Sequence, residues 1–159
     1  MSQPPRGIGV VGCIACDATD GRLQPPGGVI FADEHWVLEH SLSPVLLPGW
    51  LILKPRRHVE HIAELTTAES ATLGHLLVRA SAAVKAALNA ERVYVCSFGE
   101  SVNHVHFYVV PRYSNMPKDG VEVINMMFSA ESPWACGDGR AAVAAERVRT
   151  EMLKIGLKR

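Results

Sequence analysis

Two histidines and a tyrosine alternate with apolar residues in one short segment, and all three carry side chains that can do chemistry. These residues are His104, His106 and Tyr108. Because successive side chains of a strand point to opposite faces, the three polar groups are expected to share one face while the apolar residues face the core. A neutral imidazole can act as a nucleophile, a proton acceptor or a metal ligand. The pair by itself also allows a plain alternative, in which the polar face is simply exposed to solvent.

Two cysteines near the start of the chain have the spacing of a metal-binding knuckle. Cys13 and Cys16 are separated by two residues, which is the spacing of many zinc ligands and also of redox pairs. A redox pair would need a thioredoxin-type βαβ pattern after it, and none follows. A metal site and a pair of free thiols both remain open, whereas Cys96 and Cys136 stand alone and are expected to pack as small apolar residues.

The histidine segment resembles the signature of the histidine triad (HIT) superfamily, in which three histidines alternate with apolar residues. The segment reads Gly99-Glu100-Ser101-Val102-Asn103-His104-Val105-His106-Phe107-Tyr108-Val109-Val110-Pro111-Arg112. A second stretch resembles the strand and turn that precede the long helix of that family. It runs from Pro48-Gly49 to Pro55-Arg56-Arg57-His58-Val59, and Leu65-Thr66 resembles the start of the helix. The resemblance covers roughly residues 13–112 and rests on the order and spacing of the motifs together.

The resemblance implies a nucleotide hydrolase that acts at the α-phosphate. The middle histidine of the family motif, here His106, is the nucleophile and forms a nucleotidyl-histidine that water hydrolyses. The backbone carbonyl of His104 is implied to fix the tautomer of His106, and Ser101 to assist the leaving group. Tyr108 takes the place of the third histidine. The resemblance also allows a nucleotidyl transferase or phosphorylase, or a nucleotide-binding regulatory protein with little turnover.

The nucleotide contacts implied by the resemblance include departures from the family pattern. They fall on His40, Ser41, Glu100 and Asn103. Glu100 stands where many relatives have glutamine, and its carboxylate would repel a polyphosphate. Ser41 stands near the position where relatives often have an aspartate or asparagine that binds the ribose. His40 has a second interpretation as an ordinary surface or loop histidine. A derivative of a purine mononucleotide with a phosphoramidate or similar leaving group therefore suits the site better than a long polyphosphate.

The resemblance also implies a structural zinc ion. Carried over by position, its ligands are Cys13, Cys16, His58 and His104, with His61 as the alternative to His58. A closed set of two thiolates and two imidazoles leaves no open coordination position, so the zinc would stabilise the fold rather than react.

The remaining pattern predicts an α+β fold with a mostly antiparallel five-stranded sheet, a long helix packed on it and a C-terminal helix. The expected strands are 29–31, 36–38, 50–53, 93–95 and 102–110, and the expected helices are 66–89 and about 139–153. Thr66 and Glu69 form a capping box at the start of the first helix. Residues 17–28 are expected to be a loop, residues 1–12 a flexible arm, and residues 13–159 a single HIT-like domain.

Composition limits the partners of the chain. Sixteen basic and sixteen acidic residues cancel, and aromatic residues make up 6% of the 159 residues, so neither a broad nucleic-acid surface nor an anionic-membrane surface is expected. The longest apolar run is too short to span a membrane. We expect a cytoplasmic protein, and the resemblance implies a homodimer.

Overall fold

The computed structural model describes residues 9–127 and 132–156, and its centre is one antiparallel sheet of five strands in the order β1-β2-β3-β5-β4. The strands are β1 (Val29–Ala32), β2 (Trp36–His40), β3 (Leu51–Pro55), β4 (Arg92–Cys96) and β5 (Phe107–Arg112). The helices are α1 (Ile14–Thr19), η1 (Ile62–Glu64, a 3-10 turn), α2 (Thr67–Leu88), α3 (Gly120–Met127) and α4 (Asp138–Gly156). The predicted α+β class with a five-stranded antiparallel sheet is confirmed.

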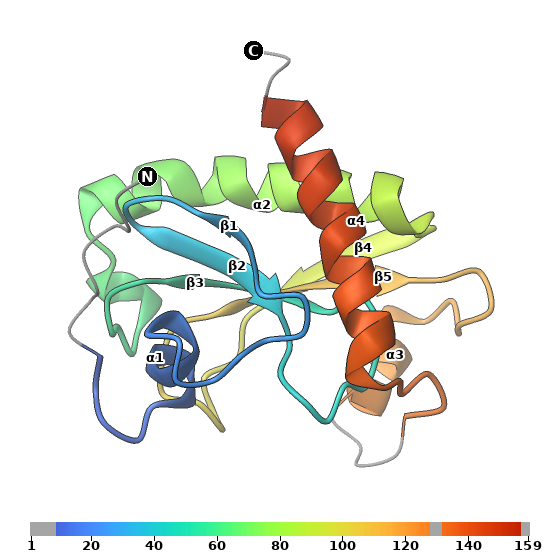
Figure 1. Ribbon diagram of the computed structural model, residues 1–159, viewed down its shortest axis with the longest axis horizontal. Coiled ribbons are helices and arrows are strands. Elements are labelled where there is room, and N and C mark those ends of the chain that lie inside the picture. Colours follow the sequence, from blue (N-terminus) through green and yellow to red (C-terminus); the bar gives the residue numbers. More distant parts are fainter. Residues whose placement is uncertain (1–8, 128–131, 157–159) are drawn as a thin grey trace.

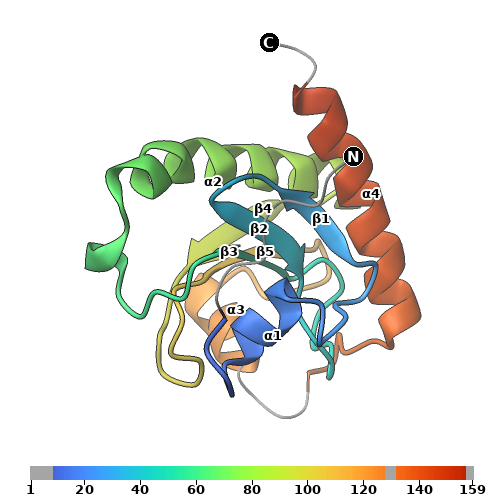
Figure 2. The ribbon, with the colours of Figure 1, turned by 60° about the vertical axis from the view of Figure 1, so that its left-hand side comes forward.

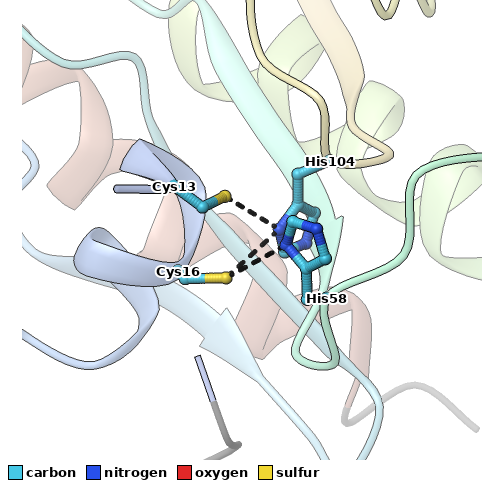
Figure 3. A group of neighbouring side chains, drawn as sticks. All are labelled: Cys13, Cys16, His58 and His104. Carbon is cyan, nitrogen blue, oxygen red and sulfur yellow. Dashed lines mark hydrogen bonds between the residues drawn. The ribbon is translucent and has the colours of Figure 1, made fainter. Parts of the chain in front are cut away.

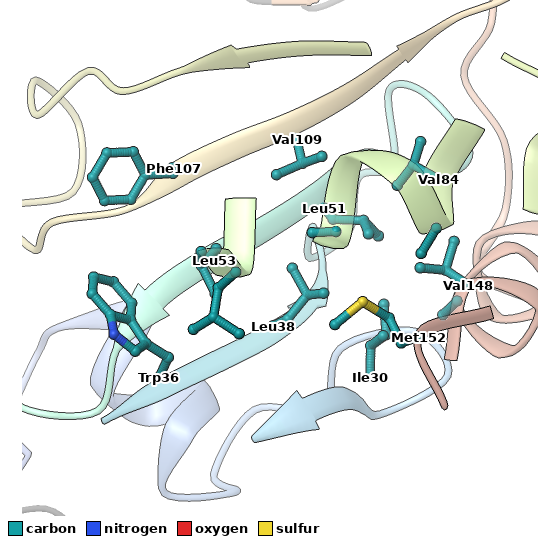
Figure 4. Packing of buried hydrophobic residues seen from close by; sticks show 14 of the residues in the cluster. Ile30, Trp36, Leu38, Leu51, Leu53, Val84, Phe107, Val109, Val148 and Met152 are labelled. Carbon is teal, nitrogen blue, oxygen red and sulfur yellow. The ribbon is translucent and has the colours of Figure 1, made fainter. Parts of the chain in front are cut away.

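The helices cover the two faces of the sheet unequally (Figures 1 and 2). The long helices α2 and α4 contact each other and lie across one face, whereas the short helices α1 and α3 lie on the other. The main hydrophobic core fills the space beneath α2 and α4 (Figure 4). Its sheet residues alternate along the strands and include Leu38, Leu51, Leu53, Phe107 and Val109. The intervening residues of these strands therefore face α1 and α3.

The register of the strands decides which side chains meet on the face toward α1 and α3. Glu39 pairs with Ile52, and Ile52 pairs with Tyr108, so these residues form one row across β2, β3 and β5. A smaller apolar cluster, which includes Trp50, Tyr108, Val110 and Val123, closes the α3 side of this face. The α1 side holds the polar groups described below.

The start of α2 follows the predicted capping box. The Thr66 hydroxyl accepts the backbone N–H of Glu69 at 3.2 Å, and the Glu69 carboxylate accepts the backbone N–H of Thr66 at 2.8 Å. Glu69 also receives the Arg57 guanidinium at 2.9 Å. The capping box therefore also ties the turn after β3 to the helix.

Several element boundaries differ from those expected. The strand predicted over 102–110 begins only at residue 107, because the N–H of His104 donates to the Val102 carbonyl and that of Val105 to the Val59 carbonyl. The predicted loop 17–28 overlaps α1, and α3 was not expected. The C-terminal helix extends beyond the predicted bounds, to residues 138–156. Residues 1–8 of the expected arm lie outside the described residues, and residues 11–12 form a turn.

Among the helices of residues 9–127 and 132–156, none has the length and apolar character that crossing a membrane requires.

Candidate active site and metal site

His106 immediately precedes β5, and its ring is held in one orientation from both sides. Its Nδ1 lies 2.7 Å from the backbone carbonyl of His104. A carbonyl can only accept, so Nδ1 carries a proton, and in the neutral ring the lone pair is then on Nε2. Nε2 lies 2.9 Å from the Tyr108 hydroxyl, and the hydroxyl therefore donates to it. This is the tautomer in which an imidazole can attack an electrophile through Nε2.

The His106 ring lies at the wall of a cavity of about 250 Å³. Tyr108, Trp50 and Ile52 also line this cavity, together with Ile14, Ala15 and Ala18 of α1. Burial raises the pKa of Tyr108 above its usual value, so its phenol stays protonated and can donate at neutral pH. The expected face of His106 and Tyr108 is therefore turned toward a cavity rather than packed into the core.

His104, the third polar residue of the segment, belongs to a separate cluster of four potential metal ligands (Figure 3). The other members are Cys13, Cys16 and His58, and their ligand atoms all lie within 4.8 Å of one another. The His104 Nδ1 lies 3.5 Å from the Cys13 Sγ and 3.6 Å from the Cys16 Sγ. His58 approaches through its Nδ1, which is 3.4 Å from the Cys16 Sγ.

These separations fit a tetrahedral metal site. Bonds of about 2.3 Å to sulfur and about 2.05 Å to nitrogen, at tetrahedral angles, place the sulfur and nitrogen ligands about 3.6 Å apart. The protonation of His104 also fits, because its Nε2 donates to the Pro55 carbonyl at 3.0 Å and Nδ1 is left free to bind a metal. Burial lowers the pKa of His104 to about 4, so its ring is neutral at pH 7. The Glu60 carboxylate lies 3.5 Å from the Nε2 of His58, as expected for a histidine whose other nitrogen holds a metal.

The cluster and the His106 ring are connected through one residue. The side chain of His104 contributes to the cluster, while its backbone carbonyl accepts the Nδ1 proton of His106. A ligand that holds the His104 ring therefore also restrains the residue whose carbonyl orients the ring of His106.

The other residues expected at the site lie in several places. Ser101, Glu100 and Asn103 are exposed and do not line the cavity. Asn103 instead hydrogen-bonds Glu60, and this bond helps to hold the pKa of Glu60 below its usual value. Ser41 does line the cavity. His61, the alternative metal ligand, is exposed and lies outside the cluster.

His40 is fully buried, so its interpretation as a surface histidine was wrong. Its Nε2 accepts the backbone N–H of Gly49 at 2.8 Å, and its Nδ1 lies 3.0 Å from the Ser41 carbonyl. Gly49 has a φ of +85°, and a Cβ there would lie 2.3 Å from a Leu88 methyl carbon, so glycine is required. His40 thus braces the turn between β2 and β3 rather than lining the cavity.

Sequence reasoning missed a charged pair on the cavity wall. Glu39 and Lys54 are 2% and 1% exposed, and the Lys54 Nζ lies 2.5 Å from the Glu39 Oε1. Both residues line the same cavity as His106. The sequence did show one charged residue within each of two apolar strand segments. Only the register of β2 and β3, however, brings the two charged side chains together.

Comparison with known proteins identifies relatives over most of the chain. The HIT domain family model matches residues 22–115. A HIT-like protein of Saccharolobus solfataricus is 30% identical over 110 residues, which are 66% of this chain and 77% of that protein. Protein hit of Bacillus subtilis is 26% identical over 106 residues, which are 64% of this chain and 71% of that protein.

Two solved structures share the fold at low sequence identity. A Zn-bound histidine triad family protein from Mycobacterium smegmatis has a TM-score of 0.69 at 15% identity, covering 93% of this chain and 98% of its own. A hypothetical histidine triad nucleotide-binding protein from Sulfolobus tokodaii has a TM-score of 0.71 at 16% identity, and the match covers 90% of this chain and 93% of that protein.

Proposed function

Because the chain belongs to the HIT-domain family, we propose that it is a nucleotide hydrolase that acts at the α-phosphate through a covalent intermediate on His106. The observation that carries this proposal is the hydrogen bond of 2.7 Å from the His106 Nδ1 to the His104 carbonyl. It leaves the Nε2 lone pair beside a cavity, where a phosphorus atom can approach it.

The reaction has two displacement steps. The Nε2 of His106 bonds to the α-phosphorus, and the bond from phosphorus to the leaving group breaks. Water then attacks the same phosphorus and loses a proton to the solvent, while the bond from phosphorus to Nε2 breaks, returns its electron pair to Nε2 and releases the nucleoside monophosphate. The His104 carbonyl stabilises the positive charge that the imidazole carries in the intermediate, because it accepts the remaining ring proton.

Tyr108 takes part in the first step of the proposed reaction. Its hydroxyl must leave Nε2 before the attack, and it can then donate to a phosphate oxygen. The same hydrogen bond favours the second candidate, a nucleotide-binding protein with low turnover, because it holds the nucleophilic lone pair while no phosphate is near.

The test is hydrolysis of adenosine and guanosine 5′-phosphoramidates by the purified full chain, with the monophosphates measured by chromatography. We expect monophosphate to form, and the His106→Ala variant to be slower by about 10³-fold or more. The His75→Ala variant, which changes an exposed histidine of α2, is the matched control and should keep the full rate. Equal rates for the His106→Ala variant and the natural chain would rule out the covalent mechanism.

Two further measurements separate the alternative functions. Intact-mass analysis of a quenched reaction should find one nucleotidyl group on the natural chain and none on the His106→Ala variant. Added inorganic phosphate should leave the monophosphate as the product. A nucleoside diphosphate would instead identify a phosphorylase, and binding without any product would identify the low-turnover protein.

We further propose that Cys13, Cys16, His58 and His104 hold a zinc ion. The support is the convergence of their four ligand atoms and the free Nδ1 of His104. A metal with four protein ligands has no open position, so the zinc would fix the position of His104 and supply no reacting group. The expected homodimer stays a prediction, for which β4 offers a sheet edge with Val95 44% exposed.

A further inference from the structure

The charged pair of Glu39 and Lys54 has more hydrogen-bonding capacity than the protein uses. The Lys54 ammonium donates to the Glu39 Oε1 and, at 2.9 Å, to the Ala15 carbonyl. These two bonds use two of the three N–H groups of a lysine. The other carboxylate oxygen, the Glu39 Oε2, is buried and has no hydrogen-bond partner among the described residues.

Such a pair is a poor way to stabilise a protein. A buried ion pair loses about as much hydration energy as its attraction returns, and an unpartnered buried oxygen adds a further cost. Two apolar side chains of similar size would serve the packing equally well. Both residues line the cavity that holds His106, so a ligand bound there could donate the hydrogen bond that the buried Oε2 lacks, once the carboxylate turns toward it.

The position of the pair fits the far end of a bound nucleotide. Glu39 and Tyr108 flank Ile52 in one row across three strands, which puts their backbones about 10 Å apart. With its phosphorus at the Nε2 of His106, a nucleoside 5′-phosphate can span this row. The cavity wall also includes the apolar residues Ile14, Ala18 and Leu42, which suit the faces of a planar base.

We propose that Glu39 and Lys54 read the hydrogen-bonding edge of the base and favour a 6-oxopurine, such as guanine, over adenine. This inference rests on the proposed function. A 6-oxopurine carries an N–H at ring position 1 that donates to the Glu39 Oε2, beside a carbonyl oxygen that accepts from the Lys54 ammonium. Guanine adds a second N–H donor next to the first. Adenine instead turns a ring-nitrogen lone pair toward the carboxylate at that position, and the two repel.

The test compares the binding of GMP and AMP by isothermal titration calorimetry, which needs no turnover. We expect the natural chain to bind GMP at least about 10-fold more tightly than AMP, because a site built to pair with an N–H rejects a base that lacks it. The Glu39→Gln variant keeps the shape of the side chain and should lose most of this preference. The Glu34→Gln variant changes an exposed glutamate between β1 and β2 and should bind like the natural chain.

A second variant covers the case in which the Glu39→Gln variant fails to fold, since it leaves the buried Lys54 charge without its counterion. The double variant Glu39→Leu, Lys54→Met removes both charges together and should fold, because a buried ion pair can be replaced by apolar residues without loss. We expect it to bind GMP and AMP within about twofold of each other.

Three results would contradict the inference and leave different parts of it standing. Equal binding of GMP and AMP by the natural chain would overturn the base preference but not the proposed function. A preference that survives in the double variant would show that the pair does not read the base. No binding of either nucleotide to the natural chain would overturn the proposed function itself.

Discussion

The chemistry proposed for this chain depends on which ring nitrogen of His106 carries its proton. The sequence motif places the imidazole next to an apolar strand, but the tautomer follows from a backbone carbonyl two residues away. Two neighbouring histidines thus have different roles, since His104 turns its Nδ1 toward the thiols, whereas His106 turns its Nε2 toward the Tyr108 hydroxyl at the cavity wall. Local hydrogen bonds, rather than residue type, assign these roles.

His40 provides a pH test of the fold. Burial lowers its pKa, although the Ser41 carbonyl partly offsets this effect. Above the unfolded value of about 6.5, the ring is neutral in both states and contributes no pH dependence. Below it, only the unfolded chain takes up the proton, so the free energy of unfolding must fall as the pH falls toward the folded pKa, by up to about 1.4 kcal/mol per pH unit.

The measurement is urea unfolding of the natural chain and of the His40→Gln variant between about pH 7.5 and pH 4.5, a range that spans the titration of histidine in the unfolded chain. Glutamine can keep an acceptor for the Gly49 N–H but does not titrate. The difference in stability between the two proteins should shrink as the pH falls. Parallel curves would show that His40 does not contribute to the acid destabilisation.

The residues of the candidate site differ in how well the sequence predicts them. Cys13 and Cys16 are recognisable because their spacing is that of many zinc ligands, whereas His104 was expected as a ligand only from the family resemblance, and it lies in the same cluster. Glu39 and Lys54 could not be paired, because their meeting depends on the register of two strands and not on a local motif. The exposed positions of Glu100 and Ser101 likewise depend on the path of a loop, which spacing alone does not define.

Among the helices and strands, α2 shows the closest agreement between sequence and structure. Its capping box and its apolar face are both local signals, and both are realised. The helix α3 carried a signal that was overlooked, since the Asp119 carboxylate accepts the backbone N–H groups of Val121 and Glu122. The helix α1 has only 6 residues, too few for a periodic pattern to be recognised, and its position depends on tertiary contacts such as the Lys54 bond to Ala15.

The cap of α2 gives the next prediction. Thr66→Ala removes the hydroxyl that accepts the Glu69 N–H, so the free energy of unfolding should fall by about 1 kcal/mol. Thr67→Ala changes the next residue, which is exposed and is the first of the helix, and should alter stability by less than about 0.5 kcal/mol. Urea unfolding at pH 7 measures both. Equal losses in the two variants would contradict the assignment of the cap to Thr66.

Across the whole molecule, the cluster of cysteines and histidines joins segments that are far apart in the chain. Cys13 and Cys16 lie at α1, His58 follows β3, and His104 precedes β5 (Figure 3). The short helix α1 has few other means of attachment, whereas the sheet and the long helices share an extensive core. A bound metal would therefore hold α1 against the sheet and close the α1 wall of the cavity.

Removing the metal should consequently affect both stability and nucleotide binding. At a zinc concentration about a thousandfold above its dissociation constant, binding adds about 4 kcal/mol to the free energy of unfolding. For a chain of 159 residues this corresponds to a rise in Tm of about 8–16 °C. We expect elemental analysis of the purified protein to find one zinc per chain. A chelator should lower Tm by that amount and weaken GMP binding, and added zinc should reverse both effects.

The control variants change one cysteine each. Cys16→Ser should remove the response to zinc, whereas Cys96→Ser, which changes a cysteine outside the cluster, should keep it. If the chelator left both Tm and GMP binding unchanged, α1 would be held by its protein contacts alone, and the cluster would be a pair of free thiols beside two histidines.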